Sequence, residues 1–277
     1  MKKIADIFKS APKSIIKFDN YFEIYDRIFS KFINKKITLV EVGIGFGGSL
    51  FMWKSFFGED SRIIGIDLNP EAKKLEEHGF EIFIGDQSDP KFWENFYNHV
   101  GKIDILIDDG GHRNLQQISS LVESINYIND NGLIIIEDTH TSFMRKKGFK
   151  NPSKYSFINY CVRLIENIHR RNPLVEKENN FFSKKIYSIE FFNSLTVINI
   201  DSKRCQNSSS IKNDLDIKNW FTDYRHEGYY IKSKKFFSRI SNNSLFNRVI
   251  RKIFHRNLFF SMHEKYRIKK YINKTKE

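Results

Sequence analysis

Cysteine is nearly absent from this sequence: Cys161 and Cys205 are the two in 277 residues. Two cysteines cannot supply the disulfide framework of a small secreted domain, so we expect a reducing compartment. The sequence also lacks the uninterrupted apolar run of roughly 18 residues that a membrane-spanning helix needs. Its first 17 residues contain lysines but no apolar core of signal-peptide length. These absences predict a soluble, cytoplasmic protein.

Most of the chain has no net charge. Residues 1–202 contain 27 basic and 27 acidic side chains, whereas residues 203–277 contain 19 basic and 6 acidic ones. A neutral main part argues against nucleic acid as a partner, and the basic extension predicts contact with an anionic surface or partner. The 27 Phe and 12 Tyr residues exclude global disorder, because so much aromatic surface must be buried.

Short apolar runs alternate with helix-compatible segments after residue 36. The runs span 37–43, 62–67, 80–86, 102–109 and 132–138, and the intervening helical segments lie near 48–57, 70–78, 89–99, 113–129 and 153–170. This alternation predicts a doubly wound α/β fold with a parallel sheet covered on both faces. Two further runs, at 185–192 and 194–200, predict an antiparallel hairpin at one edge, which gives seven strands in all.

Helical extensions flank this predicted domain of residues 37–202. Residues 1–36 form an N-terminal helical segment in which 18–33 have amphipathic spacing. Residues 203–277 form a basic C-terminal extension with a polar linker and an amphipathic helix at 244–260. Such a helix docks on its own domain, lies on an anionic membrane surface or binds an acidic partner, and the sequence leaves all three open.

A glycine-rich turn follows the first predicted strand. Gly43, Gly45 and Gly47 come directly after Glu41 and precede a helix, as in sites where a ligand approaches the backbone closely. Asp67 ends the second strand, where a carboxylate can bind ribose hydroxyls, and Asp86, followed by Gln87, ends the third in a position suited to an adenine edge. Because Gly43, Gly45 and Gly48 also satisfy G-x-G-x-x-G, an NAD-type oxidoreductase is a competing interpretation.

Acidic residues cluster at the ends of the fourth and fifth predicted strands. The fourth ends in Asp108-Asp109-Gly-Gly-His112 and the fifth in Glu137-Asp138. Carboxyl ends of parallel strands line one crevice, so these carboxylates need a counter-charge, and we expect a divalent cation that prefers oxygen ligands. Helix capping by one acid per strand is the alternative.

These motifs resemble class I S-adenosylmethionine-dependent methyltransferases, and more narrowly the metal-dependent sugar O-methyltransferases of the mycinamicin type. The resemblance implies a Rossmann-like sheet over residues 37–200 and an S-adenosylmethionine site at Glu41, Gly43, Gly45, Gly47, Asp67, Asp86, Gln87 and Asp108. It further implies Mg²⁺ on Asp109, Glu137 and Asp138, with His112 as the general base. The family's N-terminal oligomerisation domain is not expected in this sequence. The family's acceptor recognition and quaternary structure are therefore not carried over, and a homo-oligomer stays one possibility.

The predicted reaction is methyl transfer to a saccharide hydroxyl in surface-polysaccharide (capsule) or natural-product biosynthesis. A metal would acidify and position the hydroxyl, and imidazole exchanges protons near neutral pH. A basic loop at 143–150 also suits an anionic acceptor, so a phosphate or phosphoramidate oxygen is an alternative target. A non-catalytic adaptor that binds a membrane or partner is the non-enzymatic alternative. If the amphipathic basic helix binds an anionic membrane, the enzyme would lie peripherally at the inner membrane surface.

Overall fold

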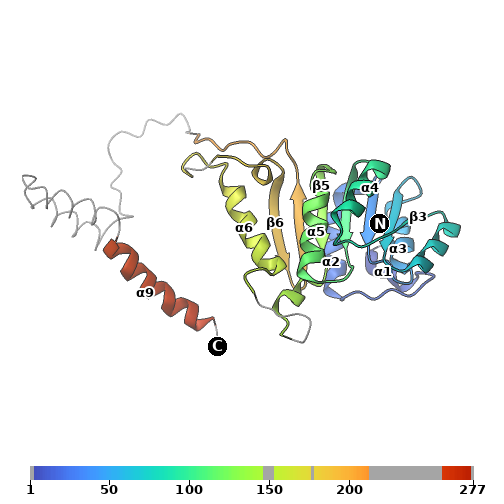
Figure 1. The fold of residues 1–277 in the computed structure, drawn as a ribbon, viewed down its shortest axis with the longest axis horizontal. Coiled ribbons are helices and arrows are strands. Elements are labelled where there is room, and N and C mark those ends of the chain that lie inside the picture. The colour runs from blue at the N-terminus through green and yellow to red at the C-terminus, as the bar shows by residue number, and fades with distance from the viewer. Residues whose placement is uncertain (1–2, 146–152, 176–177, 212–257, 276–277) are drawn as a thin grey trace, which may run out of the picture. The chain divides into compact units, whose positions relative to one another are not determined.

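The structure is a computed structural model that describes residues 3–145, 153–175, 178–211 and 258–275. Its contacts divide the chain into two units, Met1–Ser210 and Ile211–Glu277. In the first unit, seven strands form one sheet in the order β3-β2-β1-β4-β5-β7-β6 (Figure 1). The predicted fold class is therefore confirmed, including the hairpin at one edge.

The sheet is parallel from β3 to β5 and then changes direction. Its strands are β1 (Thr38–Val42), β2 (Arg62–Asp67), β3 (Glu81–Ile84), β4 (Ile103–Asp108), β5 (Ile128–Ile136), β6 (Ile186–Phe192) and β7 (Leu195–Ile200). Strand β7 pairs antiparallel with both β5 and β6. Because β1 lies between β2 and β4, the strand order reverses there, at the position where doubly wound sheets bind ligands.

Two apolar cores cover the two faces of the sheet. One contains side chains from α1 (Ile4–Lys9), α2 (Asn20–Phe29), the 3₁₀ turn η1 (Ser30–Phe32), α3 (Gly48–Phe57) and the 3₁₀ helix η2 (Pro70–His78). The other contains side chains from α4 (Pro90–Val100), α5 (Asn114–Ser124) and α6 (Phe157–His169). Two shorter 3₁₀ helices, η3 (Thr139–Phe143) and η4 (Phe182–Lys184), follow β5 and precede β6. Burial on both faces explains why the strands are nearly continuous in Ile, Val and Leu.

The N-terminal segment packs into the first unit. On α2, Phe29 is fully buried, stacks on Tyr25 at 5.2 Å and meets the edge of Trp53 of α3 at 5.6 Å between ring centroids. This aromatic contact fixes α2 against the helix that follows the glycine turn. The predicted segment 1–36 is thus continuous with the sheet domain, and the contact boundary lies at 210/211.

Strand β5 begins earlier than the sequence predicts. The helix expected over 113–129 ends at Ser124, and Ile128 already pairs with Ile103 of β4. The register then shifts before Leu133, next to Asn131 in the left-handed region and Gly132. The predicted apolar run thus covers only the second, regular half of the strand.

The second unit contains α9 (Leu258–Lys274), whose residues 265–273 are exposed. Most of the amphipathic helix predicted at 244–260 lies outside the described residues, as does most of the basic loop predicted at 143–150. Within the described ranges, no helix combines the length and apolar composition that crossing a bilayer requires.

Phe29→Ala should lower the free energy of unfolding by about 3–5 kcal/mol, because it removes a fully buried ring through which α2 packs on α3. Phe46→Ala is the matched control, since that ring is 75% exposed, and we expect a change within about 0.5 kcal/mol. Urea unfolding followed by circular dichroism measures both. Equal losses in the two variants would contradict the packing described.

Candidate active site

The carboxyl ends of β1, β4 and β5 meet at one edge of the sheet. Val42 pairs with Asp108, and Asp108 pairs with Ile136, so the residues that follow these strands emerge side by side. The acidic motifs predicted at two separate strand ends therefore lie in one place, next to the glycine turn.

The glycine turn is shaped by residues in the left-handed region. Gly43 and Gly47 have φ values of +80° and +82°. A Cβ on Gly43 would lie 2.3 Å from the backbone oxygen of Asp109, so glycine is required for close approach to the β4 loop. A Cβ on Gly45 would meet no atom within 4 Å, so the turn is open at its tip.

Asp67 and Asp86 lie where the sequence predicts a ribose and an adenine site. Asp67 Oδ2 accepts hydrogen bonds from the backbone N–H groups of Ile44 and Gly45, each at 3.1 Å. The Asp67 carboxylate therefore braces the glycine turn and is half-buried. Asp86 is exposed and accepts hydrogen bonds from the backbone and hydroxyl of Ser88 at 2.8 Å.

Gln87 and Asp108 are buried and bonded to each other. Gln87 Nε2 donates to both Asp108 oxygens at 2.9 Å, and Gln87 Oε1 accepts from the Gly111 N–H at 2.8 Å. Asp108 also accepts from the Gly110 N–H, and burial raises its pKa. The pair holds the Asp-Gly-Gly-His loop in shape, and direct contact of either residue with a cofactor stays a prediction.

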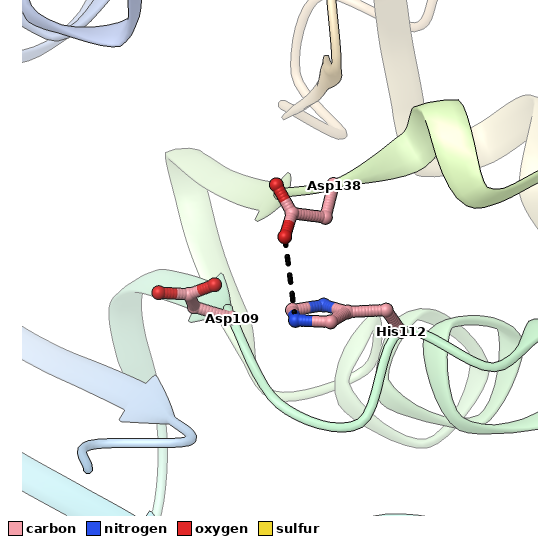
Figure 2. Close-up of side chains that lie close together, drawn as sticks. All are labelled: Asp109, His112 and Asp138. Atoms are coloured by element: carbon pink, nitrogen blue, oxygen red, sulfur yellow. Dashed lines mark ion pairs between the residues drawn. The ribbon is translucent and has the colours of Figure 1, made fainter. Parts of the chain in front are cut away.

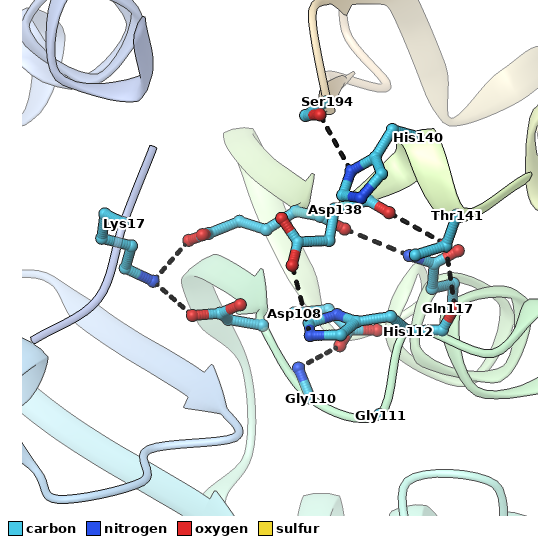
Figure 3. Close-up of polar contacts among 12 residues, drawn as sticks. Lys17, Asp108, Gly110, Gly111, His112, Gln117, Asp138, His140, Thr141 and Ser194 are labelled. Atoms are coloured by element: carbon cyan, nitrogen blue, oxygen red, sulfur yellow. Dashed lines mark hydrogen bonds and ion pairs between the residues drawn. The ribbon is translucent and has the colours of Figure 1, made fainter. Parts of the chain in front are cut away.

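A buried ammonium group lies among the predicted carboxylates. Lys17 Nζ is 2.7 Å from Asp109 Oδ2, 2.7 Å from Glu137 Oε1 and 3.3 Å from Glu41 Oε1, and its side chain is 1% exposed. Lys17 approaches the acidic residues from one side and His112 from the other (Figure 3). The sequence predicts a metal ion as the counter-charge, whereas the structure places the ammonium of Lys17 there.

The inner carboxylates are fully enclosed. Glu41 is 0% exposed and accepts a hydrogen bond from Ser49 Oγ at 2.5 Å, so it is not a solvated strand-end acid. Burial raises the pKa of Glu41, and it raises the pKa of Glu137 to about 8 against the opposing charge of Lys17. Burial alone would lower the pKa of Lys17, but the charges of Glu137, Glu41 and Asp109 together hold it well above its usual value.

Asp109, His112 and Asp138 form a second, more open group (Figure 2). His112 Nε2 lies 3.3 Å from Asp138 Oδ2, and the side chains of the three residues are 21–27% exposed. One ligand atom from each lies within 4.8 Å of the others, as required for binding one metal ion. Both His112 and Asp138 have positive φ values, 54° and 53°, and such backbone strain is common at functional sites.

The predicted metal set is divided between these two groups. Asp109 belongs to both, Asp138 faces His112, and Glu137 faces Lys17. The structure thus brings Asp109 and Asp138 together with the predicted base, while a metal-binding role for Glu137 remains a prediction.

The N-terminal segment contributes two phenol groups that the sequence reading missed. Tyr25 donates a hydrogen bond to Glu137, and Tyr21 donates one to Asp138 Oδ1 at 2.9 Å. Burial raises the pKa of both tyrosines, so they remain neutral donors. Their helical spacing predicted only a packed face, and no local motif marks Lys17.

His140 is held by the edge hairpin. Its Nδ1 lies 2.9 Å from Ser194 Oγ, and its ring meets the edge of Phe18. Gln117 Nε2 donates to the Glu137 backbone oxygen at 3.1 Å and so supports the end of β5.

Similar solved structures identify the architecture. The MycE methyltransferase of the mycinamycin biosynthetic pathway, solved with Mg, SAH and mycinamycin VI, matches with a TM-score of 0.66 and 22% identity. The match covers 84% of this chain and 59% of that one. The fold is the class I methyltransferase fold. No protein-family model matches the chain.

Curated relatives of the sequence are sugar O-methyltransferases. The mycinamicin VI 2''-O-methyltransferase of Micromonospora griseorubida is 34% identical over 126 residues, which is 43% of this chain and 31% of that protein. An 8-demethyl-8-alpha-L-rhamnosyl tetracenomycin-C 2'-O-methyltransferase of Streptomyces olivaceus is 29% identical over 157 residues, or 54% and 41%. The matches thus span less than half the length of these relatives. They confirm the resemblance on which the site assignments depend.

The raised pKa of Glu137 predicts a pH-dependent stability. Between about pH 5 and pH 8 the folded protein retains a proton that the unfolded chain has lost, so the free energy of unfolding should fall as pH rises. Glu137→Gln should reduce this fall by at least about 1 kcal/mol, the equivalent of one pKa unit. Urea unfolding at pH 5, 6.5 and 8 measures it.

Glu94→Gln, at an exposed helical position, serves as the control and should follow the wild-type curve. Parallel pH curves for wild type and Glu137→Gln would show that Glu137 does not hold the proton.

Proposed function

We propose that the protein is an S-adenosylmethionine-dependent O-methyltransferase that methylates a saccharide hydroxyl, with a divalent cation, in natural-product or surface-polysaccharide biosynthesis. The observation that carries the proposal is the position of His112 beside Asp138 and Asp109, at the strand ends next to the glycine turn. The sugar O-methyltransferase relatives support the reaction class, and their macrolide and tetracenomycin substrates favour natural products.

The residues present fit S-adenosylmethionine. The open tip of the turn at Gly45 leaves room for a ligand, Asp67 lies at the end of β2 for the ribose, and the exposed Asp86 lies at the end of β3 for adenine. Glu41 is already bonded to Ser49 and Lys17, so we assign it to the floor beneath the methionine end of the cofactor.

The donor set also fits a hard divalent cation. Asp109 and Asp138 offer carboxylate oxygens on the more exposed side of the cluster, with Glu137 as the third predicted ligand. A bound metal ion would act as a Lewis acid that orients acceptor oxygens and lowers the pKa of the acceptor hydroxyl.

We assign His112 as the group that accepts the acceptor's proton. Its Nδ1 is buried, so Nε2, which faces Asp138, is the nitrogen that an acceptor can reach. The Asp138 carboxylate, 3.3 Å from Nε2, would stabilise the imidazolium that forms as the acceptor oxygen attacks the methyl group. Tyr21 holds the other Asp138 oxygen and so orients this carboxylate.

Three alternative functions make different demands on the protein. A phosphate or phosphoramidate acceptor depends on the basic loop, most of which lies outside the described residues. An NAD-type oxidoreductase would leave the clustered carboxylates unexplained, and an adaptor would not bind the cofactor. A cytoplasmic site of action and contact of the basic extension with a membrane surface remain predictions.

Calorimetry and a transfer assay test the proposal together. The protein should bind S-adenosylhomocysteine but not NAD⁺, and should transfer a labelled methyl group to one or more members of a panel of sugars, nucleotide sugars and glycosylated natural products. Excess EDTA should abolish transfer, and Mg²⁺ should restore it. Binding of NAD⁺ without binding of S-adenosylhomocysteine would refute the proposal. Full activity in excess EDTA would refute its metal dependence.

His112→Ala should lower kcat by about 10²–10⁴-fold, because the acceptor hydroxyl loses its general base. The dissociation constants for S-adenosylhomocysteine and Mn²⁺ should remain within about threefold of wild type. His99→Ala, on α4, is the control and should retain activity. A loss of Mn²⁺ affinity in His112→Ala would instead identify His112 as a metal ligand.

A further inference from the structure

A cavity of about 310 Å³ lies in the first unit, away from the predicted active site. The end of α2, the turn η1, strands β6 and β7 and the residues just after β7 line it. Tyr21, in the first turn of α2, bonds to Asp138, whereas Arg27 and Lys31 of the lining lie at and beyond the other end of that helix. The methyl-transfer proposal gives this cavity no role.

The walls of the cavity contain more positive than negative charge. Arg27, Lys31 and Arg204 line it together with one carboxylate, Glu190, which gives a net charge of +2. Glu190 already has partners, because its Oε2 is 2.6 Å from Arg27 Nη2 and its Oε1 accepts a hydrogen bond from Asn199 Nδ2 at 2.9 Å. The charges of Lys31 and Arg204 are thus not balanced by the lining.

Lys31 has neutral partners. The residue is half-buried, and its Nζ donates to the backbone oxygen of Asn131 at 2.8 Å and to Asn131 Oδ1 at 3.2 Å. Burial lowers the pKa of Lys31, the charge of Asp201 opposes this shift, and the positive charge of Arg204 adds to it. A bound anion would offset the repulsion between the two cations.

Arg204 holds its guanidinium over an aromatic ring. Its Cζ lies 3.6 Å from the ring centroid of Tyr187, and its backbone N–H donates to Asp201 Oδ1 at 3.2 Å. Within the part of the chain that the structure describes, the guanidinium forms no ion pair with a carboxylate. A guanidinium restrained in this way loses little conformational freedom on binding, and its planar fork matches two oxygens of a phosphate group.

A phosphate group is the anion that these residues suit. A phosphate monoester has a charge of about −1.5 to −2 at pH 7 and three strong acceptor oxygens, which match two unbalanced cations with several N–H donors. The Ser188 hydroxyl, also in the lining, adds a neutral donor. Small-molecule sites have volumes of roughly 300–1,000 Å³, so this cavity is large enough for a phosphate with a small organic group attached.

We propose that this cavity is a second binding site, for a small soluble molecule that contains a phosphate group. Lys31 and Arg204 bind the phosphate oxygens, and the ion pair of Arg27 with Glu190 forms the wall beside them. The inference goes beyond the proposed function and does not rest on it.

An NMR titration of the full chain locates the site. Glucose 1-phosphate and pyrophosphate, each added in a buffer without other phosphates, should shift the backbone amide signals of Asn131, Ser188 and Asn199. Glucose should leave these signals in place, because it offers no charge to the two cations. The basic second unit also attracts anions, so shifts confined to residues 211–277 would overturn the proposal.

Single substitutions separate a built site from general attraction. Lys31→Gln and Arg204→Gln should each raise the dissociation constant for glucose 1-phosphate at least about tenfold, because each removes a charged hydrogen-bond donor. Lys36→Gln and Lys203→Gln are the matched controls. Each removes one positive charge at an exposed position outside the lining and should change the constant less than about threefold. Equal weakening by all four variants would contradict the site.

Circular dichroism and the unfolding temperature show whether each variant folds as the wild type does. Arg204 is exposed, so Arg204→Gln should keep the wild-type unfolding temperature within about 2 °C. If Lys31→Gln does not fold, Arg204→Gln decides the matter alone. Wild-type affinity for glucose 1-phosphate in a folded Arg204→Gln would overturn the proposal.

Discussion

The crowding of carboxylates at neighbouring strand ends is the constraint on which the rest of the structure depends. Parallel pairing of β1, β4 and β5 brings Glu41, Asp109 and Glu137 together, and burial makes their mutual repulsion costly. The ammonium of Lys17 and the hydroxyl groups of Ser49 and Tyr25 offset this cost, because they bond to the buried carboxylates. Most other features of the site serve to hold these partners in place.

The N-terminal segment therefore belongs to the site as much as to the core. Its aromatic face packs on α3 through Phe29, which places Tyr21, Tyr25 and Lys17 over the ends of β1, β4 and β5. The contact of Lys13 and Ser14 with Gly48 connects the same segment to the helix that follows the glycine turn. One stretch of chain thus connects the carboxylate cluster with the helix that follows the glycine turn.

Features that depend on local pattern could be predicted from the sequence. Strand β2 has the predicted bounds of 62–67, and the hairpin at 185–200 lies at the expected edge, because alternation and turn residues are local signals. The grouping of Asp109 with His112 and Asp138 followed from the rule that carboxyl ends of parallel strands share a crevice.

Features that depend on tertiary contact could not be predicted in this way. Nothing near Lys17 in the sequence signals that its ammonium will meet residues 24, 92 and 120 positions away. Gln87 likewise lies at a predicted cofactor position, but its amide is bonded to Asp108 and Gly111, a role that only the folded loop reveals.

The central proposal is that this edge of the sheet assembles a methyl-transfer centre in which strand-end carboxylates hold a divalent cation beside the cofactor. A crystal structure with S-adenosylhomocysteine and Mn²⁺, with anomalous scattering recorded at the manganese edge, tests it most directly. We predict the cofactor at the turn of Gly43 to Gly47 and a manganese peak among the carboxylates of Asp109, Glu137 and Asp138. No manganese peak at these carboxylates, or a cofactor bound elsewhere, would contradict this assignment.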